Sequence, residues 1–172
     1  MDSPAFDAHG ALHVTYSGSR GQQVPVSLFR VRRDGTRESF VSGIVNPTSM
    51  AFDARGRLHV SSRFDGTVYR VSPDGTPEVV ATDLGVACGI AFGRDGAMYV
   101  GDRSGTIFRV EDSGNASAFA AIPPSVAAFH LAMAPDDSLF VTAPTLAPYD
   151  HVYRIDRRGS VEVVYSGFGR PQ

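Results

Sequence analysis

The sequence has no apolar run long enough to cross a membrane, only one cysteine, and no excess of positive charge. A membrane-spanning helix needs about 20 largely apolar residues, so we expect no membrane partner. The single cysteine, Cys88, excludes an internal disulfide and a zinc site built from several cysteines. A formal net charge of -2 supplies no basic face, so we expect no nucleic-acid partner.

No secretory signal is expected either, because Met1 is followed at once by the polar and proline residues Asp2, Ser3 and Pro4. The chain has 172 residues, of which 42% are apolar and 20% charged, as in an ordinary soluble globular domain. The compartment stays open, and an extracytoplasmic location of a longer parent protein is one alternative.

The chain does contain a repeated unit of about 40 residues, which is typical of propellers and related arrays. The first strand-like run of each unit aligns at Ala5, Ala51, Ala91 and Ala132. The second run aligns at Leu12 to Val14, Leu58 to Val60, Met98 to Val100 and Leu139 to Val141. The third aligns at Phe29 to Val31, Tyr69 to Val71, Phe108 to Val110 and Tyr153 to Ile155. Residue-glycine pairs then lead into a fourth run, so each repeat reads as four strands joined by hairpins.

These repeats predict an all-β protein, a β-propeller of four-stranded antiparallel blades, with four blades in this chain. The expected blades are residues 3–43, 46–83, 86–121 and 126–166, and residues 167–172 are expected to lead into a further blade. An incomplete ring exposes the broad apolar faces of its end blades. We therefore expect either further blades of the same chain or a self-association partner to cover them.

One segment favours a helix on local grounds. Residues 125–134 are rich in good helix formers. The repeat register instead assigns their second half to the first strand of the fourth blade, and Pro123 and Pro124 stand just before them. We follow the register and predict a strand.

The best-formed repeat runs from Pro47 to Val60, with the pattern Pro-x-x-Met-Ala-Phe-Asp-x-x-Gly-x-Leu-x-Val. This pattern resembles the NHL repeat and the blade of the senescence-marker-protein/gluconolactonase superfamily, and all four repeats fit it. The resemblance implies a six-bladed ring, of which this chain would form a part. It leaves the activity open, because such propellers include lactonases, other hydrolases and binding modules.

The enzymes of that superfamily hold one divalent cation with Glu, Asn and Asp oxygens where the inner strands begin. In this chain those positions are Asp2, Thr48, Cys88 and Phe129, and Asn46 lies two residues before Thr48. A calcium, zinc or magnesium ion is therefore expected only if the chain is a lactonase, with Asp2, Asn46 and His130 as candidate ligands. No other cofactor is evident from the sequence.

Residues that recur in every blade are expected to be structural, whereas those that break the repeat are candidates for a site. The recurrent arginines are Arg30, Arg70, Arg109 and Arg154. His13 and His59 share a slot that Tyr99 and Phe140 fill in the other blades, which indicates packing rather than metal binding.

Two connections are longer than their counterparts, at residues 16–23 and 143–151. Long loops on one rim of a rigid scaffold often form binding surfaces. The candidate binding residues at the channel mouth and these loops are Asp2, Asn46, Thr48, Cys88, His130, Arg63, Asp102, Arg103, Tyr149 and Asp150. The alternative is that they only pack or tie adjacent blades together.

Three functional hypotheses follow. The first is a non-catalytic module that binds a small molecule, a carbohydrate or a protein. The second is a metal-dependent lactonase or related hydrolase with part of its site in blades beyond this chain. The third is a partial propeller that associates with itself to close the ring.

Overall fold

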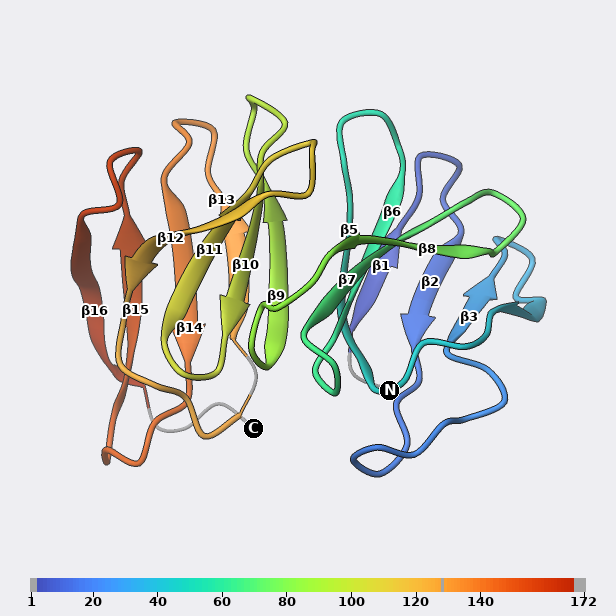
Figure 1. Cartoon of the computed structure of the whole chain (residues 1–172), viewed down its shortest axis with the longest axis horizontal. Coiled ribbons are helices and arrows are strands. Elements are labelled where there is room, and N and C mark those ends of the chain that lie inside the picture. The colour runs from blue at the N-terminus through green and yellow to red at the C-terminus, as the bar shows by residue number, and fades with distance from the viewer. Residues whose placement is uncertain (1–2, 128, 169–172) are drawn as a thin grey trace.

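The computed structural model describes residues 3–127 and 129–168, which form four antiparallel sheets of four strands each (Figure 1). Blade 1 contains β1 (Pro4–Phe6), β2 (Leu12–Thr15), β3 (Leu28–Val31) and β4 (Arg37–Val41). Blade 2 contains β5 (Pro47–Phe52), β6 (Leu58–Ser62), β7 (Thr67–Val71) and β8 (Pro77–Ala81). Blade 3 contains β9 (Ala87–Phe92), β10 (Met98–Asp102), β11 (Thr106–Val110) and β12 (Ala116–Ala121). Blade 4 contains β13 (His130–Met133), β14 (Leu139–Ala143), β15 (Asp150–Ile155) and β16 (Val161–Phe168).

Within every sheet the strands are paired in sequence order, so each blade is an antiparallel meander. The first strands β1, β5, β9 and β13 pack side by side and form the inner edge of the arc. The predicted all-β fold with four blades is therefore confirmed. In the segment for which local propensity favoured a helix, residue 128 lies outside the described residues, residues 125–127 are in no helix or strand, and His130–Met133 form β13, as the repeat register predicts.

The turns between the first two strands of the blades explain the register of the repeat. In blade 1, the Asp7 carboxylate accepts hydrogen bonds from the backbone N–H groups of His9 and Ala11, both at 2.9 Å. Gly10 follows with a φ of 79°, a left-handed conformation that suits glycine. In blade 4 the corresponding residue is Asp137, with a φ of 60°. Aspartate tolerates this conformation better than most side chains, so the turn survives without its glycine.

Three apolar cores hold the arc together, and each lies between two consecutive blades. Leu28, Val41 and Ile44 of blade 1 pack against strands of blade 2, and equivalent clusters join blades 2 and 3 and blades 3 and 4. Among the described residues, no such core joins blade 4 to blade 1. Stability is thus built blade against blade, as in other repeat arrays.

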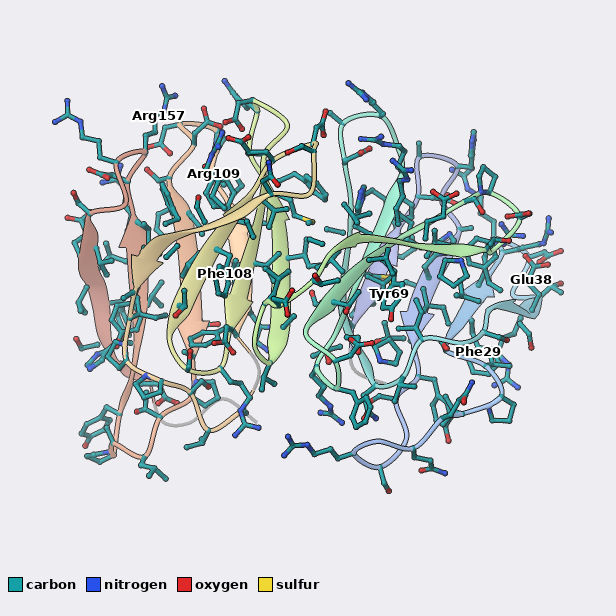
Figure 2. The ribbon with its side chains drawn as sticks, viewed as in Figure 1. Phe29, Glu38, Tyr69, Phe108, Arg109 and Arg157 are labelled. Carbon is teal, nitrogen blue, oxygen red and sulfur yellow. The ribbon has the colours of Figure 1, made fainter. Side chains whose placement is uncertain are left out.

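The residues expected to be structural have structural partners. The side chains of Arg70 and Arg154 contact the cross-strand carboxylates of Glu78 and Glu162 at 2.8 and 2.9 Å, and Arg30 pairs in the same way with Glu38. Figure 2 shows Glu38 on the outer side of blade 1. The recurrent glutamates of the outer strands are therefore partners of the recurrent arginines.

The two ends of the strands differ. One end, which we call the turn face, carries the short turns between the first and second and between the third and fourth strands of each blade. The other end, the loop face, carries the connections from blade to blade and the β2–β3 and β14–β15 loops, along the lower edge of Figure 1. Within the described chain there is no helix long and apolar enough to cross a membrane.

Candidate functional site

Asn46 organises the loop face of blades 1 and 2. It is fully buried and has a φ of 46°. Its carboxamide oxygen accepts a hydrogen bond from the backbone N–H of Gly21 at 2.6 Å, and its nitrogen donates to the carbonyls of Gly18 and Ser19. These three hydrogen bonds hold the β2–β3 loop in place. Because the carboxamide oxygen already accepts one of them, a metal ion would have to compete with the Gly21 N–H for that oxygen.

Thr48 and Cys88 occupy corresponding positions at the starts of β5 and β9. The Thr48 hydroxyl donates to the carbonyl of Asn46 at 3.1 Å, and the Cys88 thiol lies 3.3 Å from the carbonyl of Val86. Both side chains are buried, and Cys88 is only 1% exposed. Phe129, which precedes β13, is buried in the same cluster as Cys88. In blades 2, 3 and 4 the side chains at this position are therefore packed in the interior.

Two arginines, Arg63 and Arg103, occupy equivalent positions of blades 2 and 3 on the loop face. Arg63 and Arg103 are the first residues after β6 and β10, and the backbone N–H of each donates to the preceding inter-blade connection, at Asn46 and Val86 respectively. Burial raises the pKa of the Cys88 thiol, while the Phe129 backbone and the positive charges of Arg103 and Arg63 act in the opposite direction. Burial is the largest of these effects, so the pKa of the thiol stays above its ordinary value.

These two arginines also differ from the recurrent ones. The chain has no lysine, so every permanent positive side-chain charge belongs to a guanidinium group. Arg30, Arg70, Arg109 and Arg154 all make ion pairs, and Figure 2 shows Arg109 towards the turn face. Within residues 3–127 and 129–168, neither Arg63 nor Arg103 takes part in an ion pair. Their charges remain available to a ligand.

Asp102 lies beside this pair, but its carboxylate is engaged. It is 6% exposed and accepts hydrogen bonds from the backbone N–H of Val86 at 2.7 Å and from the hydroxyl of Ser104. Asp102 therefore fastens the β10–β11 turn to the connection before β9. The Asp102 carboxylate therefore orients the local backbone. Because it is buried, it does not add an exposed negative charge to the rim.

In blade 4 the candidate residues are divided between surface and interior. Tyr149 is 58% exposed, whereas Asp150 is 5% exposed and accepts hydrogen bonds from the backbone and hydroxyl of Thr145. His130 is exposed at the start of β13, opposite Thr142. The structure thus brings Cys88, Asp102, Arg63 and Arg103 together with Asn46 and Thr48, and leaves the blade 4 candidates on their own blade.

Of the expected metal ligands, Asn46 lies just before β5 and His130 at the start of β13. Asp2 lies outside the described residues. Among residues 3–127 and 129–168, no three His, Cys, Asp or Glu side chains come together as a metal-binding cluster. The metal site of the lactonase hypothesis remains a prediction.

Sequence reasoning missed one residue that shapes this region. The buried hydroxyl of Ser61 donates to the carbonyl of Cys88 in the next blade and accepts from the backbone N–H of Ser49. Thr15 makes the equivalent contact with Ser3 in blade 1. The signal was a hydroxyl residue in the same slot of three repeats, immediately after the aligned valine of the second strand: Thr15, Ser61 and Thr142.

The fold and the strand order of its sheets define a β-propeller built from four-stranded antiparallel blades. No protein family and no curated protein sequence matches the chain. Solved structures do match it, and the likeness shows the fold alone because sequence identity is low.

Three of these structures represent the range of functions. A virginiamycin B lyase from Staphylococcus aureus has a TM-score of 0.72 and 14% identity, over 94% of this chain and 54% of its own. A gluconolactonase from Xanthomonas campestris has a TM-score of 0.72 and 21% identity, over 93% and 60%. An auxiliary nutrient binding protein from Bacteroides thetaiotaomicron has a TM-score of 0.76 and 14% identity, over 98% and 42%. The chain thus spans about half the length of the propellers that it resembles.

Proposed function

We propose that the chain is a binding module that takes up a small anionic molecule, such as a sugar carboxylate, at the loop face of blades 2 and 3. The observation that carries this proposal is the pair Arg63 and Arg103, which lie at equivalent positions of adjacent blades and make no ion pair with any residue that the structure describes. A guanidinium group presents planar donors that match a carboxylate or phosphate in a bidentate geometry.

The surroundings suit such a ligand. Asn46 and Val86 hold the backbones of Arg63 and Arg103 through hydrogen bonds of 3.2 and 3.3 Å, so on binding only the side chains have to become ordered. Asp102 is satisfied by its own backbone partner and does not neutralise the pair through an ion pair. Blades 1 and 4 carry no arginine at these positions, so the site breaks the repeat where a function is expected.

The test uses D-gluconate and inorganic phosphate as probes in isothermal titration calorimetry. Arg63→Gln and Arg103→Gln are each expected to weaken binding at least about tenfold, because a hydrogen bond to a charged group contributes about 1.5–3 kcal/mol. Arg55→Gln is the matched control, since Arg55 lies on the turn face with a 70% exposed side chain and loses the same charge. The proposal would be ruled out if the protein carrying both Arg63→Gln and Arg103→Gln bound the probes as tightly as the Arg55→Gln control. It would also be ruled out if the wild type bound neither probe.

The lactonase hypothesis is the second candidate, and the exposed His130 at the start of β13 is the residue that favours it. At neutral pH a histidine side chain can act as an acid, a base or a metal ligand. Hydrolysis of D-glucono-1,5-lactone above the uncatalysed rate in the presence of calcium, zinc or magnesium would support it. That rate must be abolished by chelation and lowered by His130→Ala. Hydrolysis that survives His130→Ala would remove His130 from the site.

A further inference from the structure

The side of blade 1 that faces away from blade 2 carries apolar residues at the positions that are buried between blades elsewhere in the arc. In blade 2, the residues that face blade 1 include Met50, Leu58 and Val60, which are at most 5% exposed. The residues of blade 1 at the same repeat positions are Pro4, Leu12 and Val14, and all three are exposed or half-buried. The sequence of blade 1 therefore retains the apolar surface of an interior blade, although nothing in the described chain covers it.

The same surface is hollowed. A depression of about 460 Å³ lies over blade 1, between Val14, Phe29 and Val31. Phe6, at the inner end of this side, is 69% exposed. An exposed apolar surface of this kind is typical of an interaction site rather than of a solvent-exposed protein surface.

The far side of blade 4 is the matching half of this interface. In blades 1 and 2, Leu28 and Val68 of the third strand are fully buried by the next blade. Val152 is at the same repeat position in blade 4 and is half-buried. Tyr165, which corresponds to the buried Val41, is 53% exposed. Blade 4 thus presents the face that covers the following blade elsewhere in the arc.

A backbone contact that recurs between adjacent blades at the turn face shows what kind of neighbour blade 1 would accept. A Cβ atom added to Gly75, Gly114 or Gly159 would collide with a carbonyl oxygen on the outer strand of the preceding blade. Those carbonyls belong to Phe40, Val80 and Phe119. Gly35 occupies the same turn in blade 1, and an added Cβ there would meet no atom of the described residues within 4 Å. The equivalent carbonyl at the other end of the arc belongs to Val164.

We propose that a second copy of this chain covers these faces, with blade 4 of each copy packed on blade 1 of the other. The contact is of the kind that joins blades 1 and 2, 2 and 3, and 3 and 4, so the chain already contains both complementary halves of it. A head-to-tail contact of this kind closes into a ring when the rotation permits. Two copies bring eight blades together, which is within the range of four to eight that propellers adopt.

The experiment measures the mass of the 172-residue chain by light scattering after size exclusion. The wild type is expected at twice 18.3 kDa. Gly35→Ala would place a methyl group against the partner's Val164 carbonyl and is expected to raise the dimer dissociation constant at least tenfold. Gly56→Ala is the matched control: Gly56 also has a positive φ and open space around it, but it lies in a turn that has no equivalent inter-blade contact.

A second variant guards against misfolding. Val14→Glu places a charge in the centre of the uncovered side without altering a turn, and circular dichroism verifies that each variant retains its strands. A cooperatively folded wild-type monomer, or heterogeneous aggregate without a defined dimer, would overturn the proposal and leave further blades of a longer chain as the occupant. Equal dimerisation of the Gly35→Ala, Val14→Glu and Gly56→Ala proteins would also overturn it.

Discussion

The carboxamide oxygen of Asn46 accepts the backbone N–H of Gly21 at 2.6 Å, although the two residues are 25 positions apart in the sequence. The same side chain donates to the carbonyls of Gly18 and Ser19 at 3.1 and 2.9 Å. One buried amide therefore fixes the longest loop of blade 1 to the first strand of blade 2. That loop forms part of the rim next to Arg63.

Asn46→Gly is expected to release this loop. Glycine accepts the φ of 46° without strain, so the substitution isolates the three hydrogen bonds. Loss of a buried partner costs about 1–3 kcal/mol, which urea unfolding will measure. Trypsin should also cleave after Arg20 faster in the folded variant. Asp83→Gly, another positive-φ position at 61° but on the surface, is the control, and equal effects of the two changes would refute the anchoring role.

The two buried histidines predict that stability falls in mild acid. Burial lowers the pKa of His59 below 6.5, and it lowers the pKa of His13 as well, despite the Asp7 carboxylate 3.2 Å from its Nε2 atom. A group whose folded pKa is depressed takes up protons first in the unfolded chain. The stability it contributes is therefore present above pH 6.5 and is lost as pH falls towards the folded pKa.

Comparison of urea midpoints at pH 7.5 and pH 5.5 measures this loss. His13→Phe combined with His59→Phe should flatten the dependence, because Phe140 already fills the same slot in blade 4. The two carboxylates that act on these histidines do not interfere, since, despite partial burial, hydrogen bonds lower the pKa values of Asp7 and Asp53 and both titrate in stronger acid. An unchanged midpoint shift in the double variant would show that other groups cause it.

The fold could be predicted from the sequence because every blade repeats the same pattern of strands and turns. Asp7 and Gly10 form the same turn as Asp53 and Gly56, and alignment on that turn places all four strands. Phe129 and His130 illustrate why this succeeded against local propensity: contacts with the neighbouring blade, which only the register reveals, override a helical composition.

The site was less accessible, because its chemistry depends on which atoms are already engaged. The sequence ranks Asn46, Asp102 and Asp150 as equally polar candidates near the rim. In the structure each carboxyl or carboxamide group accepts hydrogen bonds from a loop backbone, which no spacing pattern reports. Arg63 and Arg103 stand out only after the ion pairs of the recurrent arginines are known.

Cys88 is expected to behave as an inert thiol in the folded protein. It is 1% exposed, and burial raises its pKa, so little reactive thiolate forms at pH 8. Labelling with a chromogenic disulfide should therefore be slow in buffer and immediate in denaturant, with an urea dependence that follows unfolding. Rapid labelling of the native chain would show instead that the starts of β9 and β13 open locally.

The inter-blade carbonyl contacts predict unequal costs for two chemically identical substitutions. Gly56→Ala and Gly75→Ala both force alanine into a positive φ, at 73° and 89°, which costs about 1–2 kcal/mol. At Gly56 the added methyl group meets open space, whereas at Gly75 it collides with the carbonyl of Phe40. Separation of the blades to relieve that collision adds about 1–3 kcal/mol. Urea unfolding should therefore rank Gly75→Ala well below Gly56→Ala, and equal free energies would mean that adjacent blades adjust without loss of packing.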